Sequence, residues 1–472
     1  MKSTKTDIVV IGSGPGGYAA AFYAADRGKK VIMVEKDAQL GGVCLNVGCI
    51  PSKAYLHAAK LIEEAQHSDF RGITFGKARL DLNKMRAWKN SITGKLAGGV
   101  ATLAKSRGVE VMYGRGYFED SNTLRVETKE GQKFITYDKA IVATGSRPAI
   151  PAAFDLGNKR IMSSTEALEV EEIPKSLLVV GGGYIGMELG TVYATLGSSI
   201  VLVEALDNIL AGADPDLIRP VVKNAEKAFK EIRLKAKVLK MSTYKKQIKV
   251  VMEYNGKEKE ELYDRVLVSV GRTPNSADLG LENTRVQKDE KGFIRVNDKL
   301  QTDDSMIYAI GDIAGGVLLA HKASKEARIA VDAILGENVT KKEIIVPAVV
   351  FTDPEVAWAG LTEAEAKQKG MKVEIAKFPW TASGRALTFD RTDGLTKLIV
   401  EPDTERLLGV GMVGTHAGEL IAEAVIAIEM GAAVRDIAET IHAHPTLSET
   451  LMGAAHMYYG DATDIYSPKK RH

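Results

Sequence analysis

Two stretches of this chain follow the same plan, and this repeat constrains the fold more than any other feature of the sequence. They read DIVVIGSGPGGYAAAFYAADRGKKVIMVEK at residues 7–36 and SLLVVGGGYIGMELGTVYATLGSSIVLVEA at residues 176–205. Each runs from an apolar strand through G-x-G-x-x-G into a helix of small residues, and then into a second apolar strand that ends in glutamate. The repeat predicts an α/β protein with two Rossmann-like dinucleotide-binding domains.

The glycines and the acidic residues of the two units have separate chemical roles in such a fold. The first glycine lets the chain turn out of the strand, the second lets backbone N–H groups approach a pyrophosphate, and the third lets the helix pack against the sheet. The pyrophosphate then lies at the helix N-terminus, and the carboxylate accepts hydrogen bonds from an adenosine ribose. The candidate residues are Gly12, Gly14, Gly17 and Glu35 in the first unit, and Gly181, Gly183, Gly186 and Glu204 in the second.

The second site is expected to prefer NAD to NADP. A 2′-phosphate needs an arginine nearby, whereas the stretch VLVEALDNIL around Glu204 contains acidic residues and no basic one.

Each unit is followed by a further apolar strand that ends in a glycine turn, at Gly145 in YDKAIVATGSRP and at Gly271 in YDRVLVSVGRTPN. A third such strand ends in AIGD, so Asp312 is expected to point from a strand end towards a ligand.

The remaining segments predict a long helix and a separate C-terminal domain. Apolar residues three or four apart between Leu82 and Leu103 form a helical stripe that we expect to face the core. The stretch VPAVVFTDPEVAWAG begins a strand-rich segment near residue 346, and the helix GELIAEAVIAIEMG follows it. This order predicts an α+β domain over residues 346–472.

Composition excludes several classes of function. The chain has 63 basic and 61 acidic residues, and this near balance disfavours a partner such as nucleic acid or a membrane surface. No run of 18 apolar residues occurs, so no transmembrane helix is expected. The first apolar run is broken early by glycines, as in a strand and turn rather than a signal peptide, and we therefore expect a cytoplasmic protein.

The stretch GGVCLNVGCIPSK contains both cysteines of the chain, Cys44 and Cys49. A zinc site would need a second pair of ligands, and none follows. A structural disulfide would close only a short loop and is unusual in a reducing compartment. A redox-active pair fits better, because Cys49 precedes a predicted helix whose N-terminus would stabilise a thiolate. A flavin bound by the first unit could then exchange electrons with the pair.

The stretch HAHPTLSETL contains a candidate acid–base pair, His444 and Glu449. Two interpretations remain open for it. His444 could act as a base with Glu449 as its partner. Alternatively, Thr446 and Glu449 could form a capping box for a helix that starts near Thr446, with His444 as a packed surface residue. His442 is a second candidate for the base.

Together these elements resemble the flavin-dependent disulfide oxidoreductases. The likeness covers nearly the whole chain and rests on GSGPGG, GGVCLNVGCIPSK, GGGYIGMELG, AIGD and HAHPTLSE. It implies a head-to-tail homodimer that binds FAD and NAD. It also implies an FAD-binding domain with the disulfide at 1–147, an NAD-binding domain at 148–276, a central domain at 277–345 that completes the FAD site, and an interface domain at 346–472.

The resemblance is greatest to the members that oxidise dihydrolipoamide, and it assigns roles to individual residues. Cys44 would form the mixed disulfide with the substrate, while Cys49 would face the flavin. His444 and Glu449 would form a catalytic dyad that is supplied to the partner's disulfide. Further implied contacts to FAD are those of Lys53 paired with Glu188, of Asp312 with the ribityl chain, and of Glu35 with the ribose.

The implied reaction is the oxidation of protein-bound dihydrolipoamide to lipoamide, with reduction of NAD⁺. The implied partners are the lipoyl domains of 2-oxo acid dehydrogenase or glycine cleavage complexes. Two alternatives remain. A reductase of the glutathione type would favour NADPH, against which Glu204 counts. A non-catalytic flavoprotein that senses NADH would have no need for both cysteines and the His444–Glu449 pair.

Overall fold

The computed structural model describes residues 3–342 and 344–466. Its first sheet has the strand order β3-β2-β1-β6-β5-β4, with β17 added beside β6. Strand β1 is parallel to both β2 and β6, and β17 is parallel to β6, so a segment from late in the chain completes this sheet. The strands are β1 (Ser3–Ile11), β2 (Val31–Glu35), β3 (Glu110–Tyr113), β4 (Arg115–Phe118), β5 (Thr123–Thr128), β6 (Gly131–Val142) and β17 (Ile307–Ala309).

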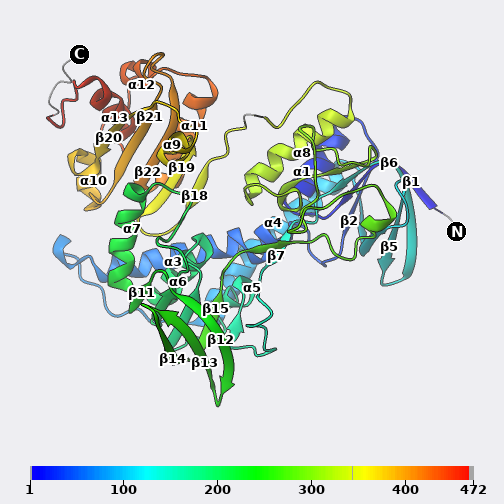
Figure 1. Cartoon of the computed structure of the whole chain (residues 1–472), viewed down its shortest axis with the longest axis horizontal. Helices are drawn as coiled ribbons and strands as arrows, with labels where there is room; N and C mark the ends of the chain where they lie inside the picture. Colours follow the sequence, from blue (N-terminus) through cyan, green and yellow to red (C-terminus); the bar gives the residue numbers. More distant parts are fainter. Residues whose placement is uncertain (1–2, 343, 467–472) are drawn as a thin grey trace.

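Helices α1 (Pro15–Asp26) and α8 (Ala320–Ile334) lie side by side against this sheet (Figure 1). The turn into α1 requires glycine for steric reasons. A Cβ atom on Gly17 would lie 1.9 Å from the carbonyl oxygen of Gly12, and Gly12 itself has a φ of 102°. The same close approach recurs in the second unit, where a Cβ atom on Gly186 would lie 2.0 Å from the oxygen of Gly181.

The second unit forms a sheet of order β11-β10-β9-β15-β8, in which the neighbouring strands are parallel. An antiparallel three-stranded sheet is inserted in the chain between β11 and β15, and the pair β7–β16 connects the two nucleotide-binding bodies. The elements are β7 (Ser146–Pro148), β8 (Ile161–Met162), α5 (Ser164–Ala167), β9 (Ser176–Val180), α6 (Tyr184–Leu196), β10 (Ser199–Val203), α7 (Pro215–Ala228), β11 (Glu231–Arg233), β12 (Lys237–Tyr244), β13 (Gln247–Tyr254), β14 (Lys257–Tyr263), β15 (Arg265–Val268) and β16 (Arg272–Pro274). The predicted α/β class with two β-α-β units is confirmed.

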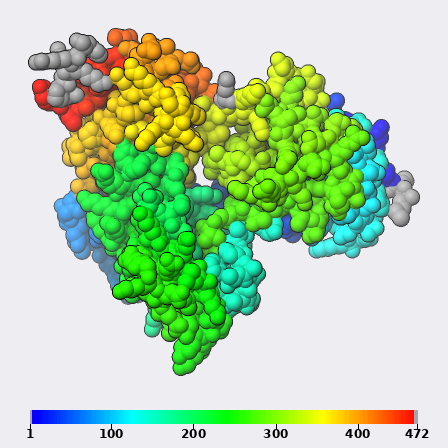
Figure 2. All heavy atoms as spheres, viewed as in Figure 1, coloured from blue at the N-terminus to red at the C-terminus, as the bar shows by residue number. Residues whose placement is uncertain are grey.

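The C-terminal body has an antiparallel sheet of order β18-β19-β22-β21-β20, with helices packed against it. It adjoins the second nucleotide-binding body around α7, as the contact between orange-yellow and green surfaces in Figure 2 shows. This arrangement is the predicted α+β domain. Its elements are β18 (Ala348–Val350), β19 (Glu355–Gly360), α9 (Glu363–Gln368), β20 (Glu374–Pro379), α10 (Gly384–Phe389), β21 (Leu395–Val400), β22 (Leu407–Gly414), α11 (Ala417–Glu429), α12 (Val434–Glu439) and α13 (Glu449–Tyr459).

Three further helices and four 3₁₀ turns complete the described part of the chain. They are α2 (Gly42–Val47), α3 (Cys49–Gln66), α4 (Leu82–Ser106), η1 (Asp69–Arg71), η2 (Leu281–Asn283), η3 (Gly311–Ala314) and η4 (Trp380–Ala382). Helix α4 confirms the predicted helix, but its stripe is not wholly core: Trp88, Leu96 and Leu103 are exposed on the single chain, whereas Val100 is buried. Across the described ranges, no helix is both long and apolar enough to span a membrane.

Candidate redox and dinucleotide site

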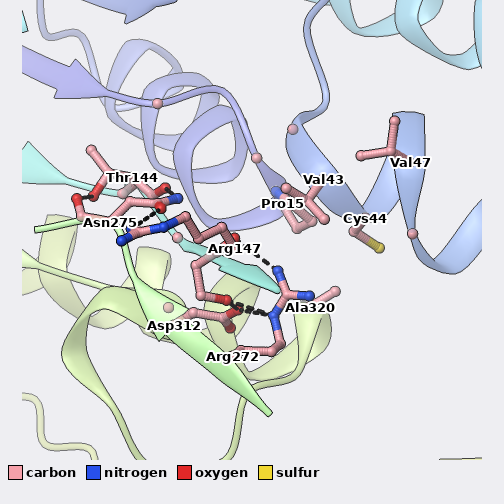
Figure 3. Close-up of a pocket in the computed structure, with 18 of the residues that line it drawn as sticks. Pro15, Val43, Cys44, Val47, Thr144, Arg147, Arg272, Asn275, Asp312 and Ala320 are labelled. Atoms are coloured by element: carbon pink, nitrogen blue, oxygen red, sulfur yellow. Dashed lines mark hydrogen bonds and ion pairs between the residues drawn. The ribbon is translucent and has the colours of Figure 1, made fainter. Parts of the chain in front are cut away.

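A cavity of ≈ 740 Å³ lies beside the first glycine turn and extends to the two cysteines. Its wall includes Gly12, Gly14, Glu35, Gly145 and Asp312 from the first sheet and its additions, and Glu188 from α6. Figure 3 shows Cys44 at one end of this cavity and Thr144 with Asn275 at the other, with Arg272 and Asp312 between them. A volume of this size is in the range of cofactor sites, and the backbone of Gly14 faces open space.

The two cysteines are joined as a disulfide between α2 and α3. Cys44 lies within α2, while Cys49 is the first residue of α3, where unpaired backbone N–H groups stabilise a thiolate after reduction. The preceding glycines hold the loop against the first glycine turn, because a Cβ atom on Gly42 would lie 2.6 Å from the Cα of Gly14. The two sulfur atoms are bonded to each other, so neither is a thiolate that could bind a metal. This favours the redox interpretation over a metal site.

Lys53 and Glu188 form an ion pair in the cavity wall. Lys53 lies one turn after Cys49 on α3, and its Nζ atom lies 3.0 and 2.8 Å from the two carboxylate oxygens of Glu188. Glu188 is 3% exposed, and it also accepts the backbone N–H of Phe351 at 3.1 Å. The Lys53 ammonium lies 4.5 Å from the centre of the Phe351 ring. The C-terminal body therefore contributes directly to this pair.

The acidic residues at the ends of β2 and β10 are held in the same way. Glu35 accepts the backbone N–H of Ser13 at 2.9 Å and its hydroxyl at 2.6 Å, and Glu204 accepts the N–H of Gly182 at 2.6 Å. Each also accepts a backbone N–H two residues further along the chain. The repeat in sequence is thus a repeat in geometry, since both carboxylates lie at the edge of a glycine turn. Gly181 and Gly183 do not line the cavity, which leaves the second turn as a separate site.

Asp312 lies in η3, just after β17, and accepts a hydrogen bond from the Ser146 hydroxyl. The same hydroxyl accepts from Nε of Arg272 at 2.7 Å, which brings the Arg272 charge to 3.7 Å from Asp312. Thr144 and Asn275 exchange hydrogen bonds at 3.0 and 2.9 Å beside this group. Asp312 was predicted, but Ser146, Arg272, Thr144 and Asn275 were not. The signal was present in GSRP and GRTPN, which were interpreted only as glycine turns that end strands.

Tyr184, the first residue of α6, also lines the cavity and was not predicted. It is 39% exposed on the single chain. Burial raises the pKa of Tyr184, while the positive charge of Arg272 acts in the opposite direction. Its phenol therefore stays a neutral hydrogen-bond donor at physiological pH.

His444 and Glu449 are paired, and they lie on the C-terminal body away from this cavity. The Nδ1 atom of His444 lies 2.9 Å from a Glu449 oxygen, the His444 side chain is 79% exposed, and neither residue lines the cavity wall. Glu449 also accepts the backbone N–H of Thr446 at 2.6 Å, which is one of the two hydrogen bonds of a capping box. The predicted helix start near Thr446 is wrong, because α13 begins at Glu449. His442 is 4% exposed, with both ring nitrogens engaged, and is not available as a base.

Comparison with known protein families gives two matches. The model described as pyridine nucleotide-disulphide oxidoreductase matches residues 6–327. The model described as the dimerisation domain of the same family matches residues 346–455. Together they extend over both nucleotide-binding bodies and most of the C-terminal body.

Similar proteins were also found along the full length. The dihydrolipoyl dehydrogenase of Haemophilus influenzae is 45% identical over 471 residues, which is 100% of this chain and 98% of that protein. That of Staphylococcus aureus is 46% identical over 97% of both chains. Among solved structures, LpdA from Mycobacterium tuberculosis has a TM-score of 0.88 at 27% identity, covering 96% of this chain and 99% of that one. The Cu(II) complex of the HOCl-induced flavoprotein disulfide reductase RclA from Escherichia coli has a TM-score of 0.86 at 28% identity, covering 97% and 100%.

Proposed function

This chain belongs to the pyridine nucleotide-disulphide oxidoreductase family and is an FAD- and NAD-dependent enzyme, and we propose that it acts as a dihydrolipoyl dehydrogenase through Cys44 and Cys49. The observation that carries the proposal is the position of this disulfide, at the start of α3 and in the wall of a cavity of cofactor size. Identity of 45% to a dihydrolipoyl dehydrogenase along the whole chain supports the choice of substrate.

The residues around the cavity fit FAD. The glycine turn at Gly12, Gly14 and Gly17 offers backbone N–H groups to a pyrophosphate, and Glu35 lies where a ribose would follow it. Gly145 and Asp312 line the same cavity, as do Lys53 and Glu188. We assign NAD to the second turn, at Gly181, Gly183, Gly186 and Glu204, with Gly271 at the end of the neighbouring strand β15.

We assign the dithiol chemistry to the two cysteines. A substrate thiolate attacks Sγ of Cys44, the Cys44–Cys49 bond breaks, and Cys49 leaves as a thiolate stabilised by the N-terminus of α3. The second substrate thiolate then attacks the substrate sulfur of this mixed disulfide, which releases Cys44 as a thiolate and closes the oxidised dithiolane. FAD, held by the first glycine turn, Glu35 and Asp312, would supply the two-electron acceptor for the reduced cysteines and the hydride donor to NAD⁺.

We assign the removal of the substrate's thiol protons to Nε2 of His444, which is free because Glu449 accepts from Nδ1. The C-terminal dimerisation domain makes the protein a homodimer. Because this pair does not line the cavity of its own chain, we propose that it serves the disulfide of the partner subunit. The four segments 1–147, 148–276, 277–345 and 346–472 would then act as FAD-binding, NAD-binding, central and interface domains.

We further propose lipoyl domains of 2-oxo acid dehydrogenase or glycine cleavage complexes as the protein partners. We also propose a cytoplasmic location, where lone cysteine pairs tend to be catalytic.

The test of the proposed function compares NAD⁺-linked oxidation of dihydrolipoamide with NADPH-linked reduction of glutathione disulfide. We expect the first activity to dominate, and anaerobic dithiol to produce a long-wavelength thiolate–flavin absorbance band. A dominant second activity would refute the substrate, and FAD-loaded protein without the band would refute the role of the cysteines.

A further inference from the structure

His442 is a buried histidine whose two ring nitrogens both face oxygen acceptors. Its Nδ1 atom lies 2.8 Å from the backbone carbonyl oxygen of Thr440, and its Nε2 atom lies 2.8 Å from a carboxylate oxygen of Glu423. A carbonyl and a carboxylate cannot donate, so the ring is the donor in each of these contacts, through whichever nitrogen carries the hydrogen. The ring therefore lies between two acceptors, one on its own loop and one on α11, which contains Glu423.

This loop also contains His444, two residues further on. It connects α12, which ends at Glu439, to α13, which begins at Glu449. His444 itself is exposed, and its Nδ1 atom bonds Glu449. The two histidines thus tie the loop to two different helices: His442 to α11 through Glu423, and His444 to α13 through Glu449.

We infer that His442, together with Glu423, is a positioning residue that fixes the His444-bearing loop for proton transfer. This inference rests on the proposed role of His444. The His444 ring is exposed, and solvent does not fix its position. The His442 side chain is buried and lies between two acceptors, so it can fix the loop. Proton transfer is sensitive to small displacements of the base, and a misplacement of about 1 Å can cost about 100-fold in rate.

The bond from His442 to Glu423 connects the loop to α11, whereas the bond to Thr440 stays within the loop. Two amide substitutions distinguish the effects of these two bonds. An asparagine amide nitrogen lies at the same number of bonds from Cγ as Nδ1, and a glutamine nitrogen matches Nε2. His442→Gln therefore keeps a donor for Glu423, while His442→Asn keeps a donor only for Thr440. Glu423→Leu removes the acceptor and keeps a similar volume.

We expect His442→Asn and Glu423→Leu to lower kcat for NAD⁺-linked dihydrolipoamide oxidation by about 10- to 100-fold, and His442→Gln to stay within about twofold of wild type. NADH oxidation by ferricyanide, which needs no thiol base, should be unchanged in all three. Equal effects of the Asn and Gln variants, no effect of the Asn variant, or a parallel loss of both activities would overturn the inference. A merely structural role predicts the parallel loss.

A matched control and a second measurement keep the test independent of the substrate. His456 on α13 also bonds a carboxylate, Asp461, through Nδ1 at 2.9 Å, and His456→Gln, which loses the donor at the Nδ1 position, should leave dihydrolipoamide oxidation unchanged. Amide hydrogen exchange in a peptide that covers residues 440–449 should be faster in His442→Asn than in His442→Gln. If wild type fails to oxidise dihydrolipoamide, the proposed function is refuted. Equal exchange in the two variants would refute the tie to α11.

Discussion

Glu188 is the residue at which three parts of the chain meet. Its carboxylate lies on α6, accepts from Lys53 on α3, and accepts from the backbone of Phe351 just after β18. Because it is almost fully buried, its charge is compensated locally and not by water. The sequence alone favours a surface carboxylate on a helix for this residue, and only the resemblance indicated its pairing with Lys53.

Replacing Glu188 with glutamine should leave the Lys53 charge uncompensated beside the cavity. We expect kcat for dihydrolipoamide oxidation to fall by about tenfold, and the flavin potential to become more positive, since an unpaired cation favours an anionic reduced flavin. Steady-state kinetics and an anaerobic titration against a reference dye measure both quantities. Glu63→Gln, on the exposed end of α3, is the control. An unchanged potential would contradict this role of the pair.

We expect Glu204 to determine the preference for NAD at the second glycine turn. Its carboxylate is held by the backbone of Gly182 and Leu206, ready to accept from a ribose diol. Hydrogen bonds to a charged group contribute about 1.5–3 kcal/mol, so Glu204→Ser should raise the KM for NAD⁺ at least tenfold and reduce the NAD⁺/NADP⁺ ratio of kcat/KM. Asp207→Asn, three residues away, should change neither. An unchanged ratio in Glu204→Ser would exclude this function of the carboxylate.

At the scale of elements, the sequence predicted the helices and strands that depend on residues close together in the chain. The two β-α-β units and the helix after Cys49 follow from glycine spacing and apolar runs, and all are present. Helix α2 was not predicted, because six residues that include a glycine give no helical period. Helix α13 starts later than predicted, because only half of the capping box forms: Glu449 accepts from Thr446, but the Thr446 hydroxyl donates to Ala443.

The side chains around Asp312 were missed for a different reason. Ser146 and Arg272 come from the strands β7 and β16, which pair across more than a hundred residues of chain. The turns GSRP and GRTPN are visible separately in the sequence, but no local pattern indicates that they pair. The exposed part of the α4 stripe also depends on long-range packing, since periodicity shows which residues share a face but not what covers it.

Glu449 has two roles at the start of α13, and two substitutions separate them. Glu449→Gln keeps an oxygen for the Thr446 N–H but removes the charge that faces His444, so we expect at least tenfold slower dihydrolipoamide oxidation with unchanged stability. Glu449→Ala should lose the same activity and also about 1 kcal/mol of unfolding free energy. Kinetics and urea denaturation measure the two effects. Equal stability losses in both variants would show that the charge, not the acceptor, holds this helix start.

At the scale of the whole molecule, a buried ion cluster joins the second nucleotide-binding body to the C-terminal body. The Lys397 side chain on β21 is 0% exposed, and its Nζ atom lies 2.6 Å from Asp214, 2.8 Å from Asp216 and 2.9 Å from Glu363. Asp214 also accepts the backbone N–H groups of Glu363 and Ala364 at the start of α9. Asp214 precedes α7, so the cluster ties α7 to both β21 and α9. Within the described part of the chain, the three acids are the one group spaced to hold a metal ion, and the Lys397 ammonium already lies among them.

The charges of this cluster determine the pH range over which it stabilises the folded protein. Burial acts to lower the pKa of Lys397, but its hydrogen bonds to Asp214, Asp216 and Glu363 outweigh burial and raise it. Burial acts to raise the pKa of Asp216, but hydrogen bonds from Lys377 and Lys397 outweigh it and lower the pKa. The contribution of Asp216 is therefore present above its unfolded value of about 3.9 and is lost as the pH falls through the lower folded value. The contribution of Lys397 is complete below about 10.4 and is lost as the pH rises through the higher folded value.

Replacing Lys397 with methionine should therefore destabilise the contact between these bodies most strongly near neutral pH. Removing one partner from a buried ion cluster costs about 3 kcal/mol, whereas Lys377→Met, with a side chain 42% exposed, should cost at most about 1 kcal/mol. Urea midpoints at pH 7 measure the difference, and FAD content should be unchanged because the cluster lies outside the cavity wall. The deficit of Lys397→Met relative to wild type should shrink towards pH 3, as the carboxylates lose the charges that need Lys397. A deficit that is equal for both lysines, or that does not change with pH, would mean that packing of α7 against β19 and β22, and not this cluster, joins the two bodies.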